Sequence, residues 1–334
     1  MRRPILAASL SLLTACSVSP TSRPASASLD EGPRKLPTGR TLDPAGVAWP
    51  VGSMPLAMTL SPSGREIVIL LNGWREQGVQ VVDRASGRIL QTLPQAAAFL
   101  GLAFSPDGRT LYTSGGNQDV IYRYAWAGGR AHLTDSIIIE PKAPQKNGKR
   151  YPAGLALSPD GLRLYVAENL TDSLAVVDLA TAEVVQRFGV ERYPYGVVVD
   201  GEGTVYVSSW GGSTVSSFSA DKGWLTATGR MGAGRHPSAM LLSRDGSRLF
   251  VASGSTDRVT VLEPRRRRAV TSIIVTPPGG PGEGSTPNAL ALSDDGKRLF
   301  IAEADNNAVA IVDLAAATSG VAGATGADTV AGRV

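Results

Sequence analysis

The sequence predicts an all-β fold, a β-propeller built from four-stranded blades, and two observations carry this prediction. One pattern recurs six times along the 334 residues, with successive copies 42 to 53 residues apart. The chain is also rich in glycine (38) and proline (22) and contains no long amphipathic helical pattern. A repeat of about 40 to 50 residues with short alternating strands and tight turns is typical of propeller blades. The turn glycines of the six copies are Gly64, Gly108, Gly161, Gly203, Gly246 and Gly296.

The N-terminus predicts export and a lipid anchor. Arg2 and Arg3 precede an apolar run over 5–13, which is too short to span a bilayer, and small residues follow. The sequence Leu-Thr-Ala-Cys that ends at Cys16 resembles the lipobox of bacterial lipoproteins, in which the cysteine is acylated. We therefore expect a lipoprotein signal peptide over 1–15 and lipidation at Cys16 in the cell envelope. An ordinary secretory signal with an incidental cysteine is the alternative.

The segment after the anchor, 16–35, predicts a disordered tether. It is rich in serine, proline and alanine and has little to bury. Cys16 is the only cysteine of the chain, so no intramolecular disulfide can form and the fold depends on its core. The propeller is expected to occupy 36–334.

The copy over 151–178 shows the strands of one blade most clearly. Pro152 opens the innermost strand, where a missing N–H is tolerated, and alternating residues over 153–158 continue it. A Ser-Pro-Asp-Gly turn follows, in which Gly161 supplies a positive φ. Further strands are predicted over 162–167, 174–178 and 184–189.

The same alignment places the starts of six complete blades. Five begin at a proline and the second begins at Phe99; the others start at Pro55, Pro152, Pro194, Pro237 and Pro287. Residues 329–334 match the fourth strand of the sixth blade. Residues 36–51 have the length of one outer strand, and such a strand can complete the last blade and remove an open sheet edge.

The pattern PxxxxxSPDGxxLYVA followed by VVD resembles the YVTN-repeat, YncE-like propellers. The resemblance covers 36–334 and implies a seven-bladed disk, of which this chain holds six complete blades, as if truncated before the last one. The arrangement of lipobox, tether and blades also resembles the N-terminal half of bacterial proteins that continue into a phosphoesterase domain of the alkaline phosphatase superfamily. A genuine six-bladed propeller is the alternative.

Two sets of loops are expected to open on one face, around the central channel. These are the loops before the innermost strands and the loops between the second and third strands. The candidate ligand-binding residues there combine aromatic rings, amides, carboxylates and an arginine, a mixture that suits a polar small molecule or a peptide. They are Asn72, Trp74, Tyr151, Glu168, Asn169, Tyr193, Tyr195, Trp210, Arg235, His236, Glu303, Asp305 and Asn306. Ordinary loop polarity is the alternative for each of them.

The sequence contains no recognised catalytic motif. It has two histidines, His132 in a predicted outer strand and His236 on the predicted rim, so no histidine cluster for a metal can form, and no cofactor is expected. A GxSxG elbow and a phosphate-binding glycine loop are both absent. A carboxylate pair of Glu168 and Glu303 is conceivable, but a structural or solvated role is favoured for both.

Basic residues do not indicate nucleic acid. The formal charge is +4, with basic and acidic residues nearly balanced. The run 265–268, RRRR, falls at a predicted turn on the opposite face, and 142–150 is a basic loop between blades. A patch for anionic lipid or polymer is one interpretation, and a solvated turn is the favoured one.

Three functions remain open from the sequence. The leading interpretation is a lipid-anchored binding or scaffold module, the non-catalytic part of a larger phosphoesterase. The alternatives are a lactonase-like hydrolase, which needs acid–base or metal groups that converge on the channel, and a surface adhesion module.

The lipid anchor gives a direct test. Replacing Cys16 by serine (Cys16→Ser) removes the thiol that is acylated, so the variant is expected in the soluble fraction after cell lysis. Fractionation of membranes followed by immunoblotting checks this, and unchanged membrane recovery of the variant would refute the anchor.

Overall fold

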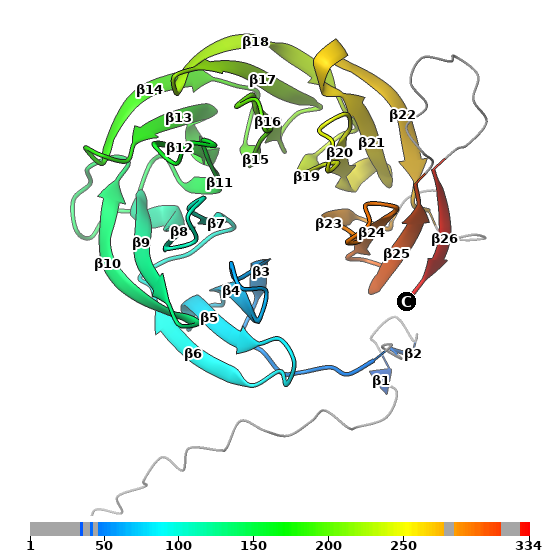
Figure 1. The fold of residues 1–334 in the computed structure, drawn as a ribbon, viewed down its shortest axis with the longest axis horizontal. Helices are drawn as coiled ribbons and strands as arrows, with labels where there is room; N and C mark the ends of the chain where they lie inside the picture. Colours follow the sequence, from blue (N-terminus) through cyan, green and yellow to red (C-terminus); the bar gives the residue numbers. More distant parts are fainter. Residues whose placement is uncertain (1–33, 36–40, 43–45, 277–283, 315–327) are drawn as a thin grey trace, which may run out of the picture.

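The computed structural model describes residues 34–35, 41–42, 46–276, 284–314 and 328–334, and it is an all-β propeller of six blades. Each blade is one sheet of four antiparallel strands that pair in chain order. Figure 1 shows the blades following one another around an arc, with the first strand of each blade innermost. The predicted fold class and the blade composition are thereby confirmed.

The strands of the six blades are as follows. The first blade holds β3 (Pro55–Leu60), β4 (Glu66–Asn72), β5 (Gln77–Asp83) and β6 (Ile89–Pro94). The second holds β7 (Leu102–Phe104), β8 (Thr110–Ser114), β9 (Val120–Ala127) and β10 (Arg130–Ile138). The third holds β11 (Pro152–Leu157), β12 (Arg163–Glu168), β13 (Ser173–Asp178) and β14 (Glu183–Gly189). The fourth holds β15 (Pro194–Val199), β16 (Val205–Ser209), β17 (Thr214–Asp221) and β18 (Trp224–Gly232). The fifth holds β19 (Pro237–Leu242), β20 (Leu249–Ser253), β21 (Arg258–Glu263) and β22 (Arg268–Ile274). The sixth holds β23 (Pro287–Leu292), β24 (Arg298–Glu303), β25 (Ala308–Asp313) and β26 (Thr329–Arg333).

Short 3-10 helices lie in four of the connections. They are η1 (Gly116–Gln118), η2 (Asn169–Thr171), η3 (Gly254–Thr256) and η4 (Pro264–Arg266). The first three lie between the second and third strands of their blades.

The turn between the first two strands of a blade is fixed by local hydrogen bonds. In the third blade the Ser158 hydroxyl donates to Asp160, whose carboxylate also accepts the N–H of Leu162. The same arrangement around Asp245 lowers the pKa of that carboxyl to about 2, because the Ser243 hydroxyl and then the Ser247 N–H donate to it. The sequence Ser-x-Asp-Gly thus sets the hairpin locally.

Both faces of the second to fifth blades are apolar, since each of these blades packs against two neighbours. The core between the third and fourth blades contains Tyr165, Val176, Val207 and Phe218, all at most 2% exposed. Comparable cores join each other successive pair, from the first and second blades to the fifth and sixth. Strands buried on both faces explain the almost continuous apolar runs of β12 and β13.

No core cluster of the described residues joins the sixth blade to the first. The face of the first blade that is turned away from the second blade has a small apolar cluster of Ile69, Leu71 and Val82. Gly52 packs closely against Leu71 of this cluster. In Figure 1 the arc has an opening between the first and sixth blades, near β1 (Arg34–Lys35) and β2 (Thr41–Leu42).

The chain ends of the propeller differ in part from the prediction. Strand β26 is the fourth strand of the sixth blade, as expected over 329–334. The alternative of a propeller closed by an N-terminal strand has no support in the described residues, where β1 and β2 pair only with each other. A seven-bladed type also has no support in the described residues, whose blades number six.

Several predicted segments lie outside the described residues. These are the signal peptide, Cys16 and nearly all of the tether. No helix of the described chain is long and apolar enough to cross a membrane.

Candidate ligand-binding face

The two predicted sets of loops do meet on one face, which we call the loop face. A backbone hydrogen bond joins the two loops in each of five blades. The donor is the N–H of a residue at the end of the second strand, and the acceptor is the carbonyl of the residue before the blade's proline. These bonds run from Asn72 to Met54 (3.0 Å), Asn169 to Tyr151 (3.1 Å), Trp210 to Tyr193 (2.8 Å), Gly254 to His236 (3.4 Å) and Ala304 to Thr286 (3.1 Å). Side chains from both sets therefore lie next to each other.

The residues before the five prolines share an unusual backbone conformation. All are left-handed, with φ between 50° and 58°, although none is glycine: Met54, Tyr151, Tyr193, His236 and Thr286. A residue before proline normally adopts an extended conformation, and a left-handed non-glycine residue costs on the order of 1 kcal/mol or more. The side chains are kept at these positions in spite of that cost.

The hairpin turns of all six blades differ from these loops, because glycine occupies the left-handed position there. Each of the six turn glycines is also left-handed, with φ between 67° and 88°. Glycine adopts this conformation without strain. Glycine therefore occupies the left-handed positions of the hairpin turns, whereas residues with side chains occupy those of the loop face. Strained non-glycine residues of this kind concentrate at functional sites.

Three carboxylates, of which Asp119 and Asp257 are buried and Asp172 is half-buried, hold strained residues in place. Asp119 accepts the N–H groups of Lys149, Arg150 and Tyr151 at 2.6 to 3.0 Å. Asp172 accepts the N–H of Tyr193 at 2.9 Å, and Asp257 accepts those of Ser285 and Thr286. Each carboxylate belongs to the blade before the loop that it binds, so one blade sets the geometry of the next.

Aromatic rings cover the loop face over the second to fifth blades. Phe99 contacts Tyr151 and Tyr195 edge to face, with ring centroids 5.1 and 6.3 Å apart. The Trp210 indole lies 6.5 Å from the Tyr193 ring and stacks on the His236 imidazole at 4.6 Å. Burial raises the pKa of Tyr195 above its usual range. Trp210 keeps 45% of its surface exposed, so part of this apolar surface is open to a ligand.

His236 is held from two sides. Its ring lies parallel to the Trp210 indole within 16°, and its Nδ1 shares a hydrogen bond with the Ser255 hydroxyl. Nε2 has no hydrogen-bond partner among the described residues. The orientation of the imidazole is therefore fixed while one ring nitrogen stays available.

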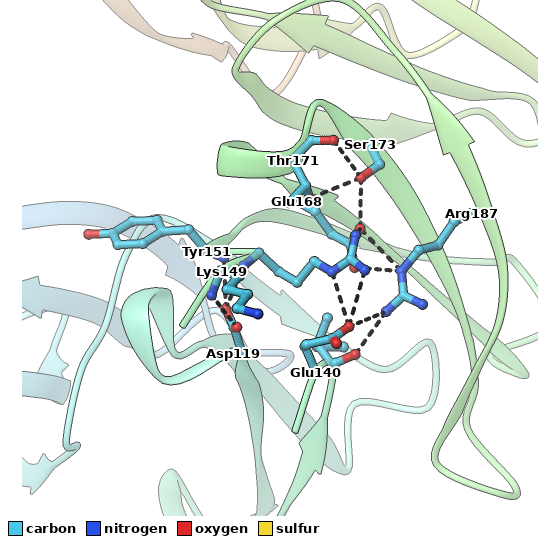
Figure 2. Close-up of polar contacts among 10 residues, drawn as sticks. Asp119, Glu140, Lys149, Tyr151, Glu168, Thr171, Ser173 and Arg187 are labelled. Carbon is cyan, nitrogen blue, oxygen red and sulfur yellow. Dashed lines mark hydrogen bonds and ion pairs between the residues drawn. The ribbon is translucent and has the colours of Figure 1, made fainter. Parts of the chain in front are cut away.

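Glu168, predicted on the rim, is fully buried in an ion-pair network (Figure 2). Its carboxylate accepts a hydrogen bond from Ser173 (2.8 Å) and lies 3.0 Å from Nε of Arg187 and 3.5 Å from Nη1 of Arg150. Arg187 also donates to the carbonyl of Ile139 in the connection from the preceding blade (2.8 Å). Figure 2 shows the Tyr151 ring directed away from this network.

Glu303 repeats this arrangement in the sixth blade. It is 1% exposed and pairs with Arg333 at 2.9 Å, which in turn donates to the carbonyl of Val275 after the fifth blade (2.7 Å). Asn306 donates to the same carboxylate and to the Ser285 hydroxyl. Since both glutamates sit at equivalent positions and link neighbouring blades, the structure favours a structural role for them over a catalytic pair.

The other predicted residues are placed as follows. Asn169 donates its side-chain N–H to the carbonyl of Pro194, and Asp305 accepts from Thr286. Asn72 ends β4, and Trp74, in the next loop, is 97% exposed. Arg235 is exposed on the loop face. No described contact joins Glu168, His236 and Glu303 to one another, and the described residues contain no group of three His, Cys, Asp or Glu side chains arranged for a metal ion.

Several residues that build the face were not predicted from the sequence. Phe99 stands where the other blades have proline, and no recurring pattern singles out Ser255. Asp119, Asp172 and Asp257 each stand eleven residues after the turn glycine of their blade, and this recurrence was a usable signal.

The basic segments are mostly paired. Arg265 contacts Glu202, Arg266 and Arg268 contact Glu263, and Arg267 donates to a backbone carbonyl. In the loop over 142–150, Arg150 contacts Glu140 at 3.1 Å. The favoured interpretation of 265–268 as a solvated turn agrees with this pairing.

Comparison with known proteins supports the fold and gives a partial family match. Residues 142–255 match the family model described as SMP-30/Gluconolactonase/LRE-like region. No curated protein matches the chain. The matched segment contains Asp172, which binds the N–H of Tyr193, and the aromatic residues from Tyr151 to His236.

Solved structures of similar fold have diverse activities. A protein from Bacteroides uniformis described as a "putative 6-phosphogluconolactonase" has a TM-score of 0.65 and 17% identity, over 83% of this chain and 85% of that one. The periplasmic gluconolactonase of Pseudomonas aeruginosa has a TM-score of 0.63 and 18% identity, with the same coverage. Hydrazine synthase of Kuenenia stuttgartiensis has a TM-score of 0.62 and 18% identity, over 78% and 76%. At these identities the likeness establishes the propeller fold alone.

The buried ion pair predicts a large loss of stability when its charge is removed. Replacing Glu168 by glutamine leaves Arg187 without its buried partner and is expected to lower the free energy of unfolding by about 3 kcal/mol. The exposed pairs of Glu263 give a matched control, and Glu263→Gln is expected to cost less than about 1 kcal/mol. Urea unfolding followed by fluorescence compares them, and equal small losses would contradict the structural role of Glu168.

Proposed function

We propose that this chain is a lactonase-like propeller that binds a sugar lactone on the loop face and hydrolyses it there. The observation that carries the proposal is the stack of His236 on Trp210, with Nδ1 held by Ser255 and Nε2 available. The partial family match and the two lactonase-related neighbours support the same class of substrate.

The aromatic surface suits one face of a sugar ring. Sugar rings present C–H groups on one side and hydroxyls at the edge, so an apolar surface with polar groups around it can bind them. The exposed part of Trp210 and the neighbouring Tyr193 supply the apolar surface. Ser255 and the other polar groups of the loops supply hydrogen-bonding partners.

His236 is the group on this surface that can move a proton. With Nδ1–H donated to the Ser255 hydroxyl, Nε2 carries a lone pair and can accept a proton from water. The resulting hydroxide adds to the lactone carbonyl carbon, and the ring C–O bond then breaks. The imidazolium returns its proton to the departing oxygen, which gives the open-chain hydroxy acid.

A binding module without catalysis is the second candidate. The burial and pairing of Glu168 and Glu303 favour it, because neither carboxylate is left to act as an acid or base on the loop face. In this second candidate the lipid anchor at Cys16 is supported by the N-terminal sequence, and the link to a phosphoesterase domain is supported by the family resemblance.

The two histidines provide a matched test of catalysis. His236→Asn removes the proposed base, while asparagine tolerates the left-handed backbone of this position. We expect hydrolysis of gluconolactone, above its spontaneous rate, to fall by about a hundredfold or more. His132→Asn, in the outer strand β10, is the control and is expected to keep the wild-type rate.

Acid release in a pH-stat measures this reaction. Unchanged hydrolysis in His236→Asn, or an equal loss in both variants, would refute the assigned base. A wild-type protein that binds the sugar without hydrolysing the lactone would instead establish the non-catalytic binding module.

A further inference from the structure

One tripeptide recurs before the innermost strands of three successive blades. It is arginine, an aromatic residue and proline, at 150–152, 192–194 and 235–237. The other three blades have Ser53, Ala97 and Ser285 at the arginine position. The fold therefore does not require arginine there, and the three arginines call for another explanation.

The three arginines differ in their partners. Arg150 is drawn into the network of Glu140 and Glu168. Arg192 and Arg235 are exposed, and neither forms an ion pair with a described carboxylate. The Arg192 guanidinium lies over the Tyr193 ring, 5.3 Å from its centroid, which restrains it without neutralising it.

The two unpaired arginines lie on either side of one short loop, 210–212. The N–H of Gly211 donates to the carbonyl of Arg192 (2.9 Å), and the N–H of His236, next to Arg235, donates to the carbonyl of Gly212 (3.1 Å). A Cβ on Gly211 would lie 2.9 Å from the Cβ of Arg192. The loop therefore lies so close to Arg192 that only glycine fits at position 211 without a shift. Trp210 begins the same loop and stacks on His236.

The neighbouring carboxylate is already engaged. Glu191 accepts the N–H of Ser213 (3.1 Å) and the hydroxyl of Thr214 (2.6 Å). It is directed at the backbone of the loop after Gly212, where a Cβ on Gly212 would meet its carboxyl group. Asp172, the other carboxylate beside the aromatic stack, accepts the N–H of Tyr193. Neither carboxylate forms an ion pair with Arg192 or Arg235 among the described residues.

We propose that Arg192 and Arg235 form a subsite for an anionic group on the ligand, so that the loop face takes a sugar carrying a phosphate or a carboxylate. This inference rests on the proposed sugar-binding function. Planar guanidinium groups bind both anions through paired N–H donors, and such charge-assisted bonds are stronger than neutral ones. The sugar ring lies against Trp210 and His236, and the anion lies toward the two arginines.

Calorimetric titration of the full chain with three stable probes tests the subsite. The probes are glucose, glucose 6-phosphate and glucuronate, which carry no charge, a phosphate and a carboxylate respectively. At least one anionic probe is expected to bind about tenfold more tightly than glucose, because charge-assisted hydrogen bonds are stronger than neutral ones. The tighter of the two identifies which anion the subsite takes.

Two arginine variants and one control locate the effect. Arg192→Gln and Arg235→Gln are each expected to reduce the ratio of anionic to neutral affinity by about tenfold. Arg230→Gln removes another exposed arginine, in β18, and is expected to leave this ratio unchanged. Circular dichroism spectra of all variants check that each is folded.

The outcomes separate the inference from the proposed function. Equal affinity for all three probes, or an equal effect of Arg230→Gln, would overturn the anion subsite while sugar binding stands. If none of the probes binds and gluconolactone is not hydrolysed, the proposed function fails and the subsite fails with it.

Discussion

The hydrogen bonds from one blade's carboxylate to the backbone of the next loop are the contacts on which the loop face depends. Asp119, Asp172 and Asp257 each lie in a left-handed turn between the second and third strands of a blade. Each accepts N–H groups from the loop that leads into the following blade. Because a propeller blade touches only its neighbours, these contacts fix the loop face locally, at three of the five junctions between successive blades.

Anchoring of this kind explains how the strained residues are maintained. Tyr151, Tyr193 and Thr286 have their N–H groups bound by a carboxylate and their carbonyls bound by the loop after the second strand. His236 is held through backbone groups at both ends. A conformation that costs on the order of 1 kcal/mol per residue persists when its surroundings determine it, and here it directs side chains to a common face.

Sequence patterns predicted what is local in this protein. The strands β11 to β14, the turn at Gly161 and the meeting of the two loop sets follow from alternation, turn residues and repeat spacing. The roles of Glu168 and Glu303 did not follow, since their partners Arg187 and Arg333 are 19 and 30 residues away on the fourth strand. The pairing of His236 with Ser255 and Trp210 also depends on how two loops meet. The six complete blades followed from the recurring local pattern, whereas the seventh blade came from the resemblance alone and has no support in the described residues.

A crystal structure of the protein with glucose 6-phosphate tests the central claim most directly, namely that the anchored loops form one ligand-binding face. The account predicts the sugar ring against Trp210 and His236 and the phosphate between Arg192 and Arg235. A sugar bound away from the loop face, or bound there with its phosphate directed away from both arginines, would contradict it.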